Sequence, residues 1–100
     1  MALKVGLLGL GTVGTGVAQI LSDAVGRSPL LEQLTIHRVG VRNLDKPRSV
    51  QIPSDRFTTD LNAIVTDPDI DVVVEVIGGI EPARTYILEA IARGKHVVTA

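Results

Sequence analysis

Two kinds of hydrophobic pattern alternate along the chain, and they predict alternating strands and helices. Short apolar runs that end at glycine or at polar residues are typical of strands. They predict strands at residues 3–8, 34–42, 57–58, 71–77 and 96–99. The fourth run places Val72, Val73 and Val74 in succession, so helices should cover both faces of the sheet.

Helices are predicted where apolar residues recur every three or four positions. The first should run from Val13 to about Gly26. A short second helix over residues 61–65 has Asp60 as its N-cap, and a third should begin at Pro82 and end at Gly94. The expected apolar face of the first helix consists of Val13, Val17, Ile20, Leu21, Ala24 and Val25, and that of the third of Ala83, Ile87, Ala90 and Ile91.

This alternation is typical of parallel βαβ units with right-handed connections. We predict an α/β fold with a doubly wound parallel sheet, in spatial order 3-2-1-4-5 and truncated after the fifth strand. In such sheets a ligand binds at the carboxyl ends of strands one and four, where the strand order reverses. Because no repeat or linker divides the chain, we expect one domain over residues 1–100.

The composition narrows the functional classes. The chain is 45% apolar and 21% charged, which is ordinary for a globular domain. A net charge of −1 without a basic run argues against a nucleic-acid surface, and no apolar run approaches the ~20 residues of a membrane helix. The absence of cysteine excludes disulfides and thiolate zinc sites. We therefore expect a cytoplasmic protein whose partners are neither nucleic acids nor membranes.

The first strand and first helix are joined by Gly9-Leu10-Gly11-Thr12-Val13-Gly14, which has the spacing G-x-G-x-x-G. Gly9 would permit a tight turn, Gly11 would let a pyrophosphate approach the backbone, and Gly14 would let the helix pack closely on the strand. A helix N-terminus also attracts phosphates. In this strand–turn–helix context we predict a Rossmann-type dinucleotide site; the alternative is a glycine-rich turn without a ligand.

The residues after the second strand bear on the choice of dinucleotide. An NAD site usually has an acidic residue there, whereas this chain has Arg42-Asn43, followed by Lys46 and Arg48. A guanidinium pairs well with the 2′-phosphate of NADP. We favour NADP, with NAD as the alternative because Asp45 lies nearby and could bind a ribose.

Around the fourth strand, Gly78 and Gly79 follow at the switch point and favour close approach of a nicotinamide ribose. Glu75 interrupts this apolar strand on the same face as Val73 and Ile77. Its carboxylate needs partners, such as backbone N–H groups of a loop, and a role near the cofactor is the alternative.

We expect structural roles for His37 and His96 and a packing role for Tyr86. No pair of histidines or carboxylates has metal-ligand spacing. We assign no catalytic residue and no metal ligand.

Four stretches together resemble homoserine dehydrogenase, namely residues 5–14, 41–43 with 46–48, 69–83 and 94–100. The resemblance implies an NAD(P)-dependent interconversion of L-homoserine and L-aspartate 4-semialdehyde, in threonine and methionine biosynthesis, by a parent that forms homo-oligomers. It also implies that Leu10 to Val13 hold the pyrophosphate and that Arg42 meets the adenosine ribose or its phosphate. The residues implied at the nicotinamide end are Ile77, Gly78, Thr99 and Ala100.

The chain departs from this family in two ways. The family often has Asp where this chain has Asn43, which weakens the case for NAD. The family also continues after the fifth strand into a catalytic lysine and a substrate and dimerisation domain, so we expect a fragment that is inactive by itself. The alternatives are a cofactor domain of the glucose–fructose oxidoreductase type and a non-enzymatic NAD(P)-sensing module.

Overall fold

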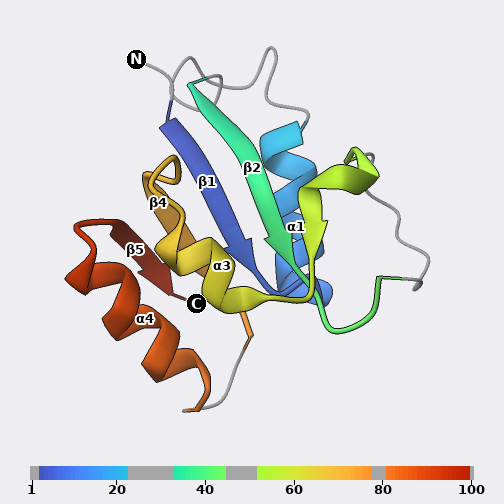
Figure 1. Ribbon diagram of the computed structural model, residues 1–100. Coiled ribbons are helices and arrows are strands. Elements are labelled where there is room, and N and C mark those ends of the chain that lie inside the picture. Colours follow the sequence, from blue (N-terminus) through green and yellow to red (C-terminus); the bar gives the residue numbers. More distant parts are fainter. Residues whose placement is uncertain (1–2, 23–32, 45–51, 78–80, 100) are drawn as a thin grey trace.

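Five parallel strands form one sheet in the spatial order β3-β2-β1-β4-β5, which confirms the predicted order. The structure is a computed structural model that describes residues 3–22, 33–44, 52–77 and 81–99 (Figure 1). The strands are β1 (Leu3–Leu8), β2 (Leu34–Gly40), β3 (Phe57–Thr58), β4 (Val72–Glu75) and β5 (His96–Thr99). All five predicted strands are present, although β2 and β4 are shorter than the apolar runs that predict them.

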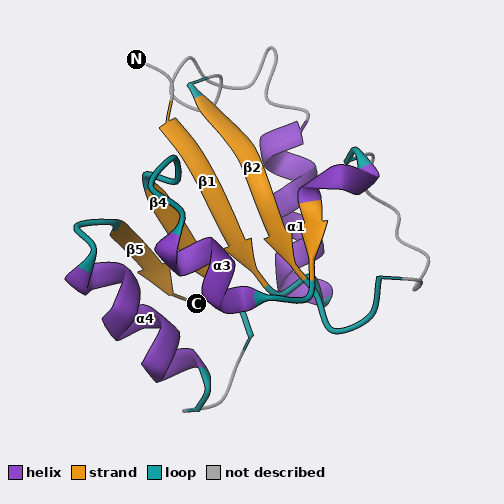
Figure 2. Ribbon diagram, viewed as in Figure 1, coloured by secondary structure: helices purple, strands orange, loops and turns teal. Residues whose placement is uncertain are grey.

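The helices within the described residues cover the two faces of this sheet unequally. They are α1 (Thr12–Ser22), the short 3-10 turn η1 (Ser54–Arg56), α3 (Leu61–Thr66) and α4 (Ala83–Ala92). Helices α3 and α4 lie on one face and α1 lies on the other (Figures 1 and 2). Helices therefore pack on both faces, as predicted. Val98 on β5 nevertheless stays 56% exposed. None of the described helices is long and apolar enough to cross a membrane.

Side chains alternate between the two faces and divide the core into two layers. Leu7 of β1 packs on the α1 side, whereas Leu8 packs under α3 and α4. Val74 and Val73 of β4 divide in the same way, because successive strand residues point to opposite faces. The buried residues of the α1 layer are Leu7, Ala18, Val39 and Val41, and those of the other layer are Leu8, Ile64, Val65, Ile70, Val73 and Ala90.

Helix α3 packs closely on the sheet where two strands carry glycine. A Cβ atom on Gly6 of β1 would lie 2.5 Å from Cγ2 of Ile64, and one on Gly40 of β2 would overlap the side chain of Leu61. The two glycines therefore make the room that Leu61 and Ile64 occupy. Gly6 lies outside the glycine-rich turn, and its role is packing.

The helix ends agree largely with their sequence signals. The Asp60 carboxylate accepts a hydrogen bond from the backbone N–H of Ala63 at 3.2 Å, which confirms the predicted N-cap. Gly94 has φ of +79°, the left-handed conformation expected of a residue that ends a helix. Pro82 precedes the first residue of α4 instead of being that residue. The predicted end of the first helix lies outside the described residues, since α1 is described to Ser22.

The prediction that the apolar helix faces are buried is wrong for two residues. Ile20 of α1 is 44% exposed and Ile91 of α4 is 56% exposed. Helix α1 meets the sheet through its small buried residues Gly14 and Ala18, which the apolar pattern did not single out. Tyr86 packs against the core beside α3, which confirms its packing role.

Candidate functional site

The glycine turn between β1 and α1 lies at the carboxyl edge of the sheet, against the end of β4. Gly9 has φ of +100°, and a Cβ atom there would lie 3.3 Å from the carbonyl oxygen of Val76. A Cβ atom on Gly14 would lie 2.6 Å from the carbonyl oxygen of Gly9. The tight turn at Gly9 and the close packing at Gly14 agree with the roles that the sequence predicts for them.

Gly11 differs from its two neighbours in the motif. A Cβ atom at Gly11 would have no protein atom within 4 Å among the described residues, so packing of the chain does not require glycine there. The first four N–H groups of a helix have no partner within it, and the partial positive charge of the helix dipole lies there. The start of α1 at Thr12 therefore offers a phosphate both hydrogen-bond donors and open space.

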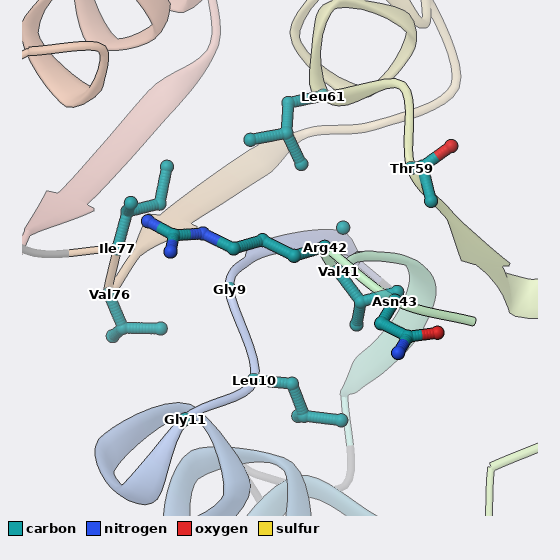
Figure 3. A pocket seen from close by; sticks show the side chains of 11 residues that line it. Gly9, Leu10, Gly11, Val41, Arg42, Asn43, Thr59, Leu61, Val76 and Ile77 are labelled. Atoms are coloured by element: carbon teal, nitrogen blue, oxygen red, sulfur yellow. The ribbon is translucent and has the colours of Figure 1, made fainter. Parts of the chain in front are cut away.

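A cavity of about 510 Å³ lies over this turn, within the range of small-molecule sites (Figure 3). The ends of β1, β2 and β4 and the segment from β3 into α3 form its walls, because parallel strands end at one edge. Its lining consists of Gly9, Leu10, Gly11, Gly40, Val41, Arg42, Asn43, Thr59, Leu61, Val76 and Ile77.

The structure brings six of the predicted site residues into this lining: Gly9, Leu10, Gly11, Arg42, Asn43 and Ile77. Gly14 packs beneath the turn instead of lining the cavity. Thr12 and Val13 form the start of α1, but their side chains lie outside the description, as do Gly78, Gly79 and Ala100 altogether.

Five lining residues were not predicted as site residues: Gly40, Val41, Thr59, Leu61 and Val76. Each lies at or shortly after the carboxyl end of a strand. The predicted strand order brings these ends together and could have identified these residues. The carboxyl end of β3 was the hardest to locate in the sequence, because this strand has only two residues.

Arg42 is the only charged residue among those described in the lining. It is exposed, and its side chain extends over the cavity in Figure 3, while Asn43 lies beside it at the end of β2. No carboxylate among the described lining residues opposes a phosphate. The cavity therefore combines an apolar wall, one cation and a helix N-terminus, which suits a phosphorylated ligand with a flat ring system.

Glu75 lies directly behind the β4 side of this cavity. Its side chain is buried, with 3% of the residue exposed. One carboxylate oxygen accepts the backbone N–H of Ile77 at 2.7 Å, and the other accepts the hydroxyl of Thr99 at 2.7 Å. The prediction that this carboxylate needs a partner such as a backbone N–H group is confirmed by Ile77, while its hydrogen bond with the hydroxyl of Thr99 on β5 was not predicted. Thr99, predicted at the nicotinamide end, is thus joined to the end of β4.

The opposite edge of the sheet holds a cluster that the sequence spacing did not reveal. His37, Asp67 and Asp69 each bring a possible metal-ligand atom within 4.8 Å of the others. Nε2 of His37 lies 3.5 Å from a carboxylate oxygen of Asp67, so the pair attract each other when the histidine is protonated. The Lys95 ammonium donates a hydrogen bond to the carbonyl oxygen of Asp67, so a positive charge that would repel a metal ion already lies at this turn. We interpret the cluster as a polar contact that holds the turn before β4 against β2.

Known proteins resemble the chain along its whole length. A family model described as "Homoserine dehydrogenase, NAD binding domain" matches residues 9–100. Homoserine dehydrogenase from Synechocystis is 63% identical over 100 residues, which are 100% of this chain and 23% of that protein. Homoserine dehydrogenase from Bacillus subtilis is 47% identical over 99% of the chain and 23% of its own length. The crystal structure of Staphylococcus aureus homoserine dehydrogenase at pH 7.0 superposes with a TM-score of 0.87 and 38% identity, over 100% of this chain and 26% of that one.

The chain thus spans about a quarter of the length of these relatives. Its sheet order, its glycine turn and its cavity are those of a domain that binds a nicotinamide dinucleotide. The chain belongs to the family of the NAD-binding domain of homoserine dehydrogenase.

Proposed function

We propose that the cavity binds NADP in preference to NAD, as the cofactor site of an enzyme that interconverts L-homoserine and L-aspartate 4-semialdehyde. One observation carries the cofactor preference. Arg42, at the end of β2, is the only charge among the described lining residues. In dinucleotide sites of this fold, that position meets the ribose that carries the 2′-phosphate of NADP. A cation there favours the phosphate, and Asn43 brings no negative charge against it.

The residues divide along the cavity into three parts. Gly9 to Gly14 would hold the pyrophosphate at the start of α1, where Gly11 leaves room for it. Arg42 and Asn43 would meet the adenosine ribose and its phosphate. Ile77, Gly78, Gly79, Thr99 and Ala100 would form the nicotinamide end.

The bound dinucleotide would supply the group that accepts or donates a hydride. The chain's own residues would bind it, orient it and exclude water from one side of it. The described lining contains no histidine, lysine, aspartate or glutamate to move the proton of a substrate hydroxyl. We therefore propose that residues 1–100 act as the dinucleotide-binding domain. Substrate binding, proton transfer and the homo-oligomeric assembly of the cytoplasmic parent would belong to parts of the protein corresponding to the remaining three quarters of its relatives.

The family match favours this activity over the glucose–fructose oxidoreductase type, since the matching relatives are homoserine dehydrogenases. A sensing module would differ from the enzyme in showing no turnover in the longer protein.

The experiment is a calorimetric titration of the chain with NADP and, separately, with NAD. We expect a smaller dissociation constant for NADP. Equal constants would contradict the preference, and no binding of either dinucleotide would contradict the cavity as the cofactor site. Adenosine 2′,5′-bisphosphate and AMP, which differ only in the 2′-phosphate, are titrated in parallel and show whether that phosphate itself produces the difference.

A further inference from the structure

Glu75 joins the last residues of two neighbouring strands. It is paired in register with Thr99 across β4 and β5, and its carboxylate adds a side-chain bond to this last rung at 2.7 Å. Its other oxygen accepts the N–H of Ile77, which lies beyond the end of β4. A single buried carboxylate therefore fixes both the exit of β4 and the end of β5. A carboxylate suits this task because it only accepts hydrogen bonds and both partners donate.

The segment that Glu75 holds is also a wall of the cavity. Val76 and Ile77 both line it. The glycine turn contacts this segment from the other side: a Cβ atom on Gly9 would lie 3.3 Å from the carbonyl oxygen of Val76 and 3.4 Å from the nitrogen of Ile77. The N–H of Val76 in turn donates to the carbonyl oxygen of Leu8 at 3.0 Å. The Val76–Ile77 peptide is thus held between the turn and the Glu75 carboxylate.

The contacts of Glu75 lie toward one end of the cavity. In the sheet order, β4 and β5 lie on one side of β1, whereas β2, which leads into Arg42, lies on the other. A displacement of the Val76–Ile77 wall would therefore change the β4 end of the cavity and leave the backbone of β2, from which Arg42 extends, in place.

We propose that Glu75 is a positioning residue for the nicotinamide ring of the dinucleotide. It holds the Ile77 backbone and the Thr99 hydroxyl in place at the carboxyl edge and does not itself contact the adenosine half. This inference rests on the proposed function, because the proposal assigns the β4 end to the nicotinamide.

Two ligands separate positioning from simple loss of stability. NADP contains both halves, and 2′-phospho-ADP-ribose is the same molecule without the nicotinamide ring. Glu75→Met keeps the length of the side chain but removes both acceptors, so the Ile77 N–H and the Thr99 hydroxyl lose this partner. Thr99→Val removes the hydroxyl from the exposed end of β5, so it tests the same hydrogen bond if Glu75→Met does not fold.

We expect each variant to bind NADP about tenfold or more weakly, because the displaced Ile77 wall would no longer meet the nicotinamide ring. The dissociation constant for 2′-phospho-ADP-ribose should change by less than about twofold, since β4 and β5 lie on the other side of β1 from the strand that leads into Arg42. Thr99→Ser keeps the hydroxyl and should restore NADP affinity. Thr66→Val is the matched control. It removes a hydroxyl that donates to the carbonyl oxygen of Asn62 at 2.8 Å on α3, and both affinities should stay unchanged.

Equal losses for the two ligands, or no loss for either, would overturn the positioning role. If the unmodified chain binds neither ligand, the proposed function fails instead. Binding of 2′-phospho-ADP-ribose without any gain from the nicotinamide ring in the unmodified chain would overturn the inference and leave the adenosine site intact.

Discussion

Gly14 of α1 packs directly against the backbone of Gly9 in the turn before the helix, because the Cβ position of Gly14 is 2.6 Å from the carbonyl oxygen of Gly9. No side-chain rotation can relieve a clash between a Cβ atom and a backbone carbonyl. The first turn of α1 must move away from β1 if Gly14 gains even one methyl group. The same helix carries Gly16, where a Cβ atom would meet no atom of the described residues within 4 Å.

Gly14→Ala should therefore destabilise the chain, and Gly16→Ala should not. Overpacking of this kind costs about 1–3 kcal/mol. A change of 1 kcal/mol shifts the melting temperature of a domain this size by roughly 4–8 °C. Gly16→Ala should raise the melting temperature, since glycine costs about 0.5–1 kcal/mol relative to alanine within a helix. Thermal unfolding followed by circular dichroism measures both variants, and equal melting temperatures would contradict the close contact at Gly14.

Gly11→Val should abolish dinucleotide binding while the fold persists. No atom of the described residues lies within 4 Å of a Cβ position at Gly11, so the new side chain has room in the fold and would collide with the ligand. A pyrophosphate could no longer approach the backbone. The circular dichroism spectrum should stay near that of the unmodified chain, and calorimetric titration should show no binding of NADP. Normal NADP affinity in this variant would mean that the phosphates bind elsewhere.

Arg42→Ala should weaken NADP binding and largely spare NAD. A hydrogen bond to a charged group is worth about 1.5–3 kcal/mol, which corresponds to an affinity change of about 10- to 150-fold. Arg93→Ala is the control, because Arg93 is an exposed arginine paired with Glu89 on α4. Parallel titrations with the two dinucleotides measure the effect. A similar loss of NAD affinity would show that Arg42 does not recognise the 2′-phosphate and contributes equally to the binding of both dinucleotides.

Lys95→Met should destabilise the chain through two lost carbonyl partners. The Lys95 ammonium donates to the carbonyl oxygens of Asp67 and Ile70, the latter at 2.8 Å, and so links the turns before β4 and β5. Loss of a partly buried charged donor should cost about 1–3 kcal/mol. Lys4→Met, at an exposed lysine of β1, should stay within about 0.5 kcal/mol of the unmodified chain in urea unfolding. Indistinguishable curves for the two variants would show that the Lys95 bonds contribute no net stability.

The 100-residue chain alone should not oxidise homoserine. Its described cavity lining holds no proton acceptor, and orientation of a substrate can supply about 7–11 kcal/mol of rate enhancement that an incomplete pocket loses. NADPH formation from homoserine measures turnover. The Synechocystis homoserine dehydrogenase, 63% identical over this chain, serves as the positive control. Turnover within about a hundredfold of that enzyme would show that the chain contains a catalytic group we have not identified.

The strand order and the glycine turn could be predicted because local signals determine them. Apolar runs, helix spacing and capping residues such as Asp60 and Gly94 each act over a few residues. The exposure of Ile20 and Ile91 could not be predicted in this way. Whether an apolar helix residue is buried depends on which neighbour faces it, and α1 contacts the sheet through Ala18.

The site residues likewise divide into those that local signals predict and those that depend on tertiary contacts. Residues of the glycine motif and Arg42 were found because a motif or a known position carries them. Leu61 and Thr59 were missed because they enter the cavity only when β3 pairs with β2. The contact between His37 and Asp67 joins residues 30 positions apart, which no spacing rule reveals.

Leu61 both fills the space above Gly40 in the core and lines the cavity, so the cavity wall is also the outer surface of the core. The cavity exists only while this core is folded, so a ligand that binds the cavity stabilises the folded state against global unfolding. At a free ligand concentration of 100 times the dissociation constant, the folded state gains about 2.7 kcal/mol. For a domain of this size that corresponds to a rise in melting temperature of roughly 10–20 °C. The unfolding midpoint of this chain thus reports how well each dinucleotide fits, even without turnover.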